Sequence, residues 1–273
     1  MTNGSNYRND IVRQLVNVIG ALFQVAAGAL GFLFGLDIAG VSDTTRSLIV
    51  PADAAFVIWT PIFLLSIAYA VYQALPANRE VPLLRTVGWF TAGAFVRNGI
   101  WELLFPNRQF LLAQLTILAI WLFLATAFVR MVRHKDEITN VQAWLVTLPI
   151  GLMFGWLTAA NLAGLAATLV GLGQRGEGMG AAIGGAALLI FGGAVAATVI
   201  AFGKRGHLLS WIPYTVAVLW ALAFIALNQR AASLLTTATA LVVAAVLVAV
   251  ALFGPTLSGR WGTRPVLTAL QEA

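Results

Sequence analysis

The residue types best suited to chemistry lie in one short apolar stretch, RNGIWELLF, residues 97–105. In a helix, Asn98, Trp101, Glu102 and Phe105 would share one face, because they are spaced at i, i+3, i+4 and i+7. An amide, a carboxyl group and two aromatic rings on one face suit ligand binding through hydrogen bonds and ring contacts. We therefore treat these four residues as candidate ligand contacts.

Arg97 and Glu102 are the two charged groups of this stretch. They are five residues apart, so on a helix of about 3.6 residues per turn they diverge by roughly 140° and do not form an ideal ion pair. Arg97 precedes Trp101 by four residues, which predicts that its guanidinium lies over the indole. A charge at mid-bilayer costs on the order of 3 kcal/mol or more, so each group should face the bundle or reach the interface. For Glu102, which lies near the end of its segment, both alternatives stay open.

A second stretch, residues 51–63, combines aromatic rings with a helix-breaking residue. Phe56, Trp59 and Phe63 fall on one side of the expected helix. Pro61 removes a backbone N–H and clashes one turn back, which predicts a kink. A kink opens space between helices, where ligands of helical bundles bind. A ligand-free packed aromatic core is the alternative.

A third stretch, residues 149–161, again places an indole and polar groups inside an apolar segment, at Trp156, Thr158 and Asn161. Three helices thus offer flat aromatic surfaces with a few neutral hydrogen-bonding groups. This mixture suits a flat, mostly apolar ligand with polar edges better than an ion path, which would need clustered carboxylates.

Several catalytic and cofactor chemistries lack their residues. The chain has no cysteine, which removes thiolate metal sites and cysteine nucleophiles. His134 and His207 fall in expected loops, so neither suits Ser/His/Asp catalysis or haem ligation. The glycine pattern at residues 171–176 lies between two apolar segments and not in a βαβ unit, so it does not indicate dinucleotide binding. We expect no metal, no cofactor and no catalytic residue, and leave enzymatic activity open.

The elements that would position these residues are long apolar segments. Of the 273 residues, 60% are hydrophobic and 10% are charged, whereas soluble domains are about 25% charged. About 20 apolar residues suffice for a helix to cross a bilayer. We predict an all-α polytopic membrane protein with eight transmembrane helices. The predicted spans are residues 11–36, 54–75, 83–105, 109–131, 141–171, 180–202, 208–228 and 233–253.

Lysine and arginine are distributed unequally between alternate loops. The N-terminal tail, the second, fourth and sixth loops and the C-terminal tail hold eleven of them, and the opposite loops hold four. Basic loops stay in the cytoplasm, which predicts cytoplasmic termini and location in the cell (inner) membrane. The net charge of +6 comes from loops and does not indicate nucleic-acid binding.

Glycine pairs four residues apart occur in three segments: Gly31 and Gly35, Gly151 and Gly155, Gly180 and Gly184. In lipid such pairs let helix backbones approach closely. They predict helix contacts within one bundle, with homodimerisation through a glycine-rich face as the alternative.

Three motifs in order resemble the TspO/MBR family, the tryptophan-rich sensory proteins related to the mitochondrial translocator protein (peripheral-type benzodiazepine receptor). The motifs are Pro51, Phe56, Trp59 and Phe63; Asn98, Trp101 and Phe105; Pro149, Thr158 and Asn161. The resemblance covers residues 11–173 and departs from the family at Met153, where a tryptophan is usual. It implies a TspO-like five-helix bundle over residues 1–173, followed by three additional helices and a short cytoplasmic tail over residues 174–273.

The resemblance also implies a pocket that binds porphyrins and related hydrophobic molecules. The residues expected to line it are Phe56, Trp59, Phe63, Asn98, Trp101, Phe105, Trp156, Thr158 and Asn161. Arg97 would meet the acidic edge of a porphyrin, with Glu102 beside it. The expected function is an integral membrane receptor or sensor for a tetrapyrrole-like ligand. The alternatives are a transporter of a small hydrophobic or amphipathic solute, a light-dependent porphyrin-degrading enzyme, and a structural partner in a membrane complex.

Overall fold

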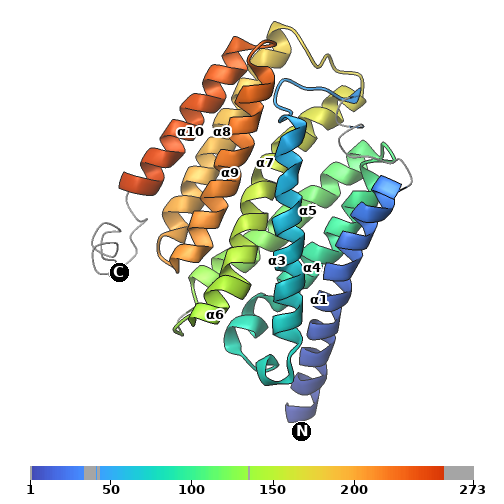
Figure 1. Ribbon diagram of the computed structural model, residues 1–273, viewed down its shortest axis with the longest axis vertical. Coiled ribbons are helices and arrows are strands. Elements are labelled where there is room, and N and C mark those ends of the chain that lie inside the picture. The colour runs from blue at the N-terminus through green and yellow to red at the C-terminus, as the bar shows by residue number, and fades with distance from the viewer. Residues whose placement is uncertain (1, 34–40, 42–43, 135, 255–273) are drawn as a thin grey trace.

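The computed structural model describes residues 2–33, 41, 44–134 and 136–254 of the chain, and within these ranges it contains helices and no strands (Figure 1). The long helices are α1 (Thr2–Leu33), α3 (Trp59–Ala74), α4 (Pro82–Leu104), α5 (Phe110–Val132), α7 (Leu148–Gly171), α8 (Met179–Gly203), α9 (Leu208–Gln229) and α10 (Leu234–Phe253). Each corresponds to one predicted span, so the prediction of an all-α polytopic membrane protein is confirmed.

Seven helical segments in the described part of the chain are long and apolar enough to cross a membrane. The remaining long helix, α4, has a similar length of 23 residues but carries Arg85, Arg97 and Glu102. It packs between α1 and α5. The long helix outside this set of seven, α4, is therefore the helix that contains Arg97 and Glu102.

The second predicted span is divided in two, and this corrects the expected kink. Residues 53–58 form a 3-10 helix, η1 (Asp53–Ile58), and the α-helix begins only at Trp59. Pro61 thus lies in the first turn of α3. A backbone N–H at this position would have no acceptor within the helix, so the N–H that proline lacks costs no helical hydrogen bond. The irregular backbone precedes the proline, and it sets Phe56 at a different angle from the side chains of α3.

Two short elements precede α7. Thr139 and Gln142 form a reciprocal capping box at α6 (Asn140–Gln142), and a π-helical segment, η3 (Ala143–Thr147), continues it. Pro149 follows in the first turn of α7. The change from π to α geometry therefore occurs where proline would otherwise interrupt the hydrogen-bond ladder.

The histidines and the glycine pattern lie between helices, as the sequence predicts. His134 follows α5 and lies 3.3 Å from Asp136. His207 caps α9, because its Nδ1 accepts the Leu209 N–H at 3.1 Å. Burial lowers the pKa of the His207 imidazole, which favours the neutral ring that this acceptor role requires. Residues 172–178 connect α7 to α8.

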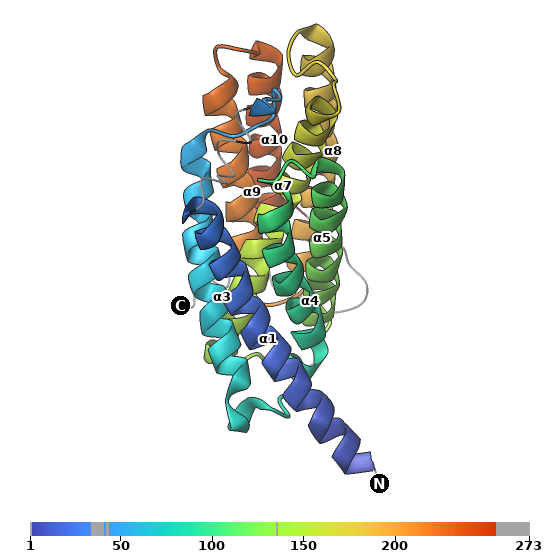
Figure 2. The same ribbon diagram turned by 90° about the vertical axis from the view of Figure 1, so that its right-hand side faces the viewer.

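The helices form a side-by-side bundle in which α7 occupies the middle (Figures 1 and 2). Helix α1 packs on α3 and α4, α4 on α5, and α5 on α7. Helix α9 packs on α7, and α10 covers α8 and α9. The N-terminal end of α1 and the C-terminal end of α10 lie at the same end of the bundle (Figure 1).

The glycine pairs have different environments. A Cβ at Gly151 would lie 2.2 Å from the Ser210 carbonyl oxygen, and a Cβ at Gly155 would lie 2.3 Å from that of Tyr214. These two glycines therefore allow α7 and α9 to touch through their backbones, as the prediction of contacts within the bundle requires. Gly180 and Gly184 on α8 have nothing within 4 Å, and Gly35 lies outside the described residues.

Candidate functional site

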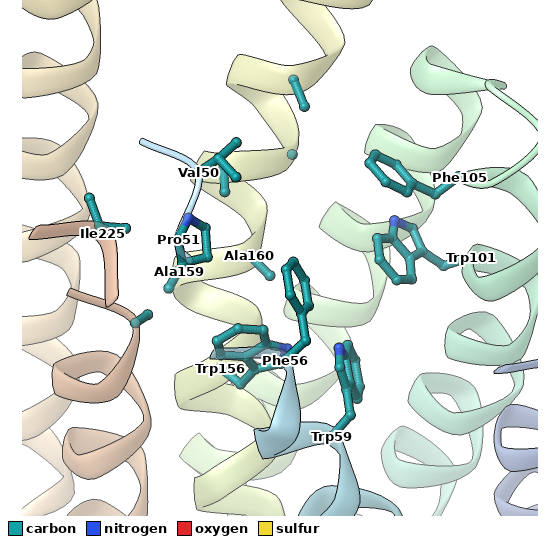
Figure 3. Close-up of a pocket in the computed structure, with 14 residues that line it drawn as sticks. Val50, Pro51, Phe56, Trp59, Trp101, Phe105, Trp156, Ala159, Ala160 and Ile225 are labelled. Atoms are coloured by element: carbon teal, nitrogen blue, oxygen red, sulfur yellow. The ribbon is translucent and has the colours of Figure 1, made fainter. Parts of the chain in front are cut away.

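A cavity lined by aromatic rings lies between η1, α3, α4, α7 and α9 (Figure 3). We call it the aromatic chamber; its cavity volume is about 50 Å³, and the wider space between the lining atoms, which includes the open surroundings, is about 590 Å³. Its lining residues are Val50, Pro51, Phe56, Trp59, Trp101, Phe105, Trp156, Ala159, Ala160, Ala163, Gly164, Ala167, Ala221 and Ile225. Small residues of α7 form one wall, and bulky rings of α3 and α4 face them.

The rings of the chamber make two kinds of contact. Trp101 lies nearly parallel to Trp59, with centroids 6.3 Å apart, and to Phe105, at 5.3 Å. Trp156 stands edge-on to Trp59 at 6.2 Å and to Phe56 at 6.0 Å. Figure 3 shows Phe56 beside Trp156 and Trp59, and Trp101 and Phe105 along the neighbouring helix. The parallel rings form a flat, electron-rich wall, and a flat ligand stacks on such a surface with offset or tilted geometry.

Two indole N–H groups of the chamber residues are buried without a hydrogen-bond partner among the described residues. They are the Nε1 donors of Trp59 and Trp156. A buried N–H without a partner costs about 1–3 kcal/mol. Both donors are therefore available to an acceptor atom of a molecule in the chamber.

Five of the nine predicted ligand contacts line the chamber, and a sixth lies directly behind its wall. Phe56, Trp59, Trp101, Phe105 and Trp156 are the lining residues. Phe63 stacks on Trp59 with centroids 5.2 Å apart, which fixes the plane of that indole. The indoles of the second, third and fifth spans therefore converge on one cavity.

The predicted polar contacts do not line the chamber. Thr158 accepts hydrogen bonds from Trp121 Nε1 at 3.0 Å and Tyr214 Oη at 3.2 Å. The Asn161 amide donates to backbone carbonyls, among them that of Ile117 on α5 at 3.2 Å. Asn98 is fully buried, but it is not among the lining residues. Thr158 and Asn161 therefore join helices to one another, whereas the Asn98 amide has no hydrogen-bond partner among the described residues.

Arg97 and Glu102 point to opposite neighbours, as their spacing predicts. Arg97 lies over the ring of Phe123 on α5, 4.5 Å from its centroid, so the expected contact with Trp101 is wrong. Glu102 is 3% exposed, so it does not reach the interface. It faces Gly28 on α1, where a Cβ would lie 3.4 Å from Glu102 Oε2. Neither residue lines the chamber.

Helix α9 contributes contacts that the sequence did not reveal. Ala221 and Ile225 line the chamber. The side chains of Asn228 and Gln229 both donate to the Val50 carbonyl at 3.0 Å. The signal in the sequence is that Asn228 and Gln229 are polar residues at the end of an apolar helix. These two hydrogen bonds hold the segment that contains Val50 and Pro51, two residues that line the chamber.

A second contact from α9 fixes η1. Trp220 Nε1 donates to the Ala55 carbonyl at 2.9 Å, and the Ala52 N–H donates to the Phe224 carbonyl at 3.1 Å. These bonds hold the short helix that carries Phe56. The last three helices are thus part of the framework of the chamber.

The Trp220 bond makes a testable prediction. Trp220→Phe keeps an aromatic ring but removes the side-chain donor to the Ala55 carbonyl, so we expect a loss of about 1 kcal/mol in the free energy of unfolding and faster amide exchange over residues 52–58. Hydrogen-exchange mass spectrometry in detergent measures the second effect. Trp144→Phe, at an exposed position of η3, is the control; equal exchange in both variants would contradict the assigned role.

Within the described residues, no group of three or more His, Asp and Glu side chains is placed to hold a metal ion. The chamber wall is formed by hydrocarbon and indole groups. Its surface can stack on, and donate hydrogen bonds to, a neutral or electron-rich molecule.

Comparison with known proteins agrees with this architecture. No curated protein and no solved structure matched the chain. The family model described as TSPO-like protein matches residues 11–253, which includes most of α1 and the seven other long helices, the last three of which the motifs did not cover. With most of its length matched and the two motif tryptophans, Trp59 and Trp101, meeting in one cavity, the chain belongs to the TSPO-like protein family.

Proposed function

We propose that the protein is a receptor or sensor that binds a flat, tetrapyrrole-like molecule in the aromatic chamber. The TSPO-like family is a class of integral, multi-pass membrane proteins with receptor, sensor or transport roles. The observation that carries the proposal is the meeting of Trp59, Trp101 and Trp156 around one cavity. Aromatic surface of this kind supplies binding energy through burial and stacking.

The free indole N–H groups specify the ligand further. A ligand acceptor, such as a carbonyl, carboxylate or ring nitrogen, would satisfy Trp59 and Trp156 together, since their centroids are 6.2 Å apart. Arg97 is turned toward α5, so it does not support the expected pairing with an acidic porphyrin edge. The ligand is thus recognised by ring stacking and by donors, without a protein charge.

Protoporphyrin IX titration tests this function. We expect saturable binding to the protein in nanodiscs, followed by the shift of the porphyrin absorbance. Trp59→Phe and Trp156→Phe each remove a donor and keep a ring, so each should weaken binding about fivefold, equivalent to about 1 kcal/mol. Trp144→Phe should bind like the wild type. Absence of saturable binding in both nanodiscs and detergent would refute the proposal.

The alternatives differ in what happens to the bound molecule. A transporter would move porphyrin across the membrane of proteoliposomes, and an enzyme would form bleached product with repeated turnover under illumination. A sensor would do neither. Flux and product analysis on the same preparation decide between the three.

Orientation, domain division and assembly are proposals of the same kind. Cytoplasmic termini follow from the charge asymmetry of the loops, and protease protection of a C-terminal tag in vesicles tests them.

The division at residue 173 lies within the family match and stays a prediction. Gly180 and Gly184 leave an open stripe on α8, which is where we place the contact of a homodimer.

A further inference from the structure

Helices α1 and α4 run in the same direction with a constant register. Thr91 Oγ1 donates to Asn17 Oδ1 at 2.7 Å, a pair 74 residues apart in sequence. Glu102 lies against Gly28, also 74 residues apart. Gln24 and Asn98 have the same separation and lie between these two contacts. The register therefore places Gln24 opposite Asn98.

These two amides are buried without partners. Gln24 and Asn98 are both 0% exposed. Neither the nitrogen nor the oxygen of either side chain has a hydrogen-bond partner among the described residues. These four unpaired polar atoms lie in the seam between α1 and α4. They are suited to hold a buried water molecule, because a buried water makes about three hydrogen bonds to groups of this kind.

The Glu102 carboxyl lies one helical turn beyond Asn98 on the same seam. It forms no ion pair among the described residues. An isolated carboxylate in a medium of low polarity is so costly that the group binds a proton instead. The two amides and the carboxyl group thus lie along the same seam between α1 and α4.

No charged group of the neighbouring described helices faces Glu102. On α1, the nearest ionisable residue is Arg13, which bonds to Asp10 and to the Arg79 carbonyl about 20 Å along the helix. On α3, the Tyr69 hydroxyl is engaged by Thr91.

The other described elements near Glu102 also provide no positively charged group that could pair with its carboxylate. Arg97 on α4 itself lies over Phe123 of α5. Asp53 of η1 and Arg108 beyond α4 are exposed, and α7 contains no ionisable residue. The carboxyl is therefore surrounded by neutral groups in the described part of the chain.

The same place adjoins the wall of the aromatic chamber. A Cβ at Gly28 would lie 3.9 Å from a ring carbon of Phe63 as well as 3.4 Å from Glu102 Oε2. Phe63 stacks on Trp59, and Trp101 is the residue before Glu102. Glu102 thus follows Trp101 in the chain and lies close to Phe63, the ring that stacks on Trp59.

We propose that Gln24, Asn98 and Glu102 form a buried proton-binding site whose occupancy alters the tryptophans of the aromatic chamber. The proton binds to a carboxylate oxygen of Glu102, and the two amides hold that oxygen and a water molecule in place. Loss of the proton to water leaves a negative charge that the amide N–H groups and water must solvate. The side chains of the seam then rearrange, and Phe63 and Trp59 move with them.

Infrared spectroscopy of the purified, ligand-free protein in nanodiscs tests the site. We expect a protonated-carboxyl C=O band that disappears as the pH is raised and is absent from Glu102→Gln at every pH. Tryptophan emission of the wild type should change over the same pH range, and that change should be lost in Glu102→Gln. Glu80→Gln, at an exposed carboxylate, should retain both signals.

A second pair of variants tests whether the amides belong to the site. Asn98→Leu should shift the frequency of the carboxyl band, since it removes a hydrogen-bonding neighbour, whereas Asn161→Leu, at an amide near α5, should not. A carboxyl band unaffected by Glu102→Gln overturns the proposal, and so does an emission change that survives this substitution. A band that titrates with sodium and not with pH also overturns it. No result depends on porphyrin binding.

Discussion

Gly155→Val will separate α7 from α9 and lower the free energy of unfolding by about 3 kcal/mol or more. The added Cβ would lie 2.3 Å from the Tyr214 carbonyl oxygen. That atom belongs to the backbone of α9, so the conflict cannot be relieved by rotating a side chain. Overpacking in a rigid interior costs about 1–3 kcal/mol, and more where backbones meet.

Gly184→Val is the matched control, compared in the monomeric protein because Gly184 lies on the stripe where we place the homodimer contact. It changes glycine to valine inside a helix, but its Cβ meets nothing within 4 Å. The intrinsic helix propensities change equally in both variants, so their difference isolates the contact between α7 and α9. Thermal unfolding in detergent should show a large loss for Gly155→Val alone. Equal midpoints for the two variants would show that α9 does not pack on α7 as described.

Gly155→Val should also weaken ligand binding in the aromatic chamber. Helix α9 carries the donors that hold Val50 and Ala55. Displacing it releases the cover of the cavity. Protoporphyrin binding should therefore fall more steeply in Gly155→Val than in Trp220→Phe, where only one bond is lost.

The sequence predicted the helices well because the apolar runs alone determine them. Each predicted span overlaps one long helix of the structure, and the divergence of Arg97 and Glu102 followed from helical geometry. The exception is the second span, where the early position of Pro61 allowed a 3-10 segment to precede the α-helix. Local sequence does not decide between that arrangement and a kink.

The site was predicted in part, for a physical reason. Periodicity shows which residues share a face of one helix, but it does not show which helix that face meets. The large indoles converged because their area has to be buried. Asn161 found carbonyls on α5, and Thr158 found Trp121 and Tyr214. The contribution of α9 depends on contacts about 165–179 residues apart in sequence, which no local pattern encodes.

The ion pair at the other end of the α1–α4 seam has the second large expected effect. Asp10 accepts hydrogen bonds from Arg13 at 3.4 Å and from Arg85 Nε at 3.0 Å. The Arg13 side chain is only 1% exposed, and it also donates a hydrogen bond to the Arg79 carbonyl at 2.7 Å. Asp10 is thus the carboxylate that balances a buried guanidinium.

Asp10→Asn should lower the free energy of unfolding by about 3–5 kcal/mol, because it leaves Arg13 charged and buried without its partner. Glu80→Gln removes the other carboxylate near Arg85, but that group is 76% exposed, so its loss should cost less than about 1 kcal/mol. Chemical unfolding in detergent measures both. Restoring stability with the double variant Asp10→Asn, Arg13→Met would identify the unpaired charge as the cause. A double variant as unstable as Asp10→Asn would instead assign the loss to the bond between Asp10 and Arg85, which joins α1 to the first turn of α4.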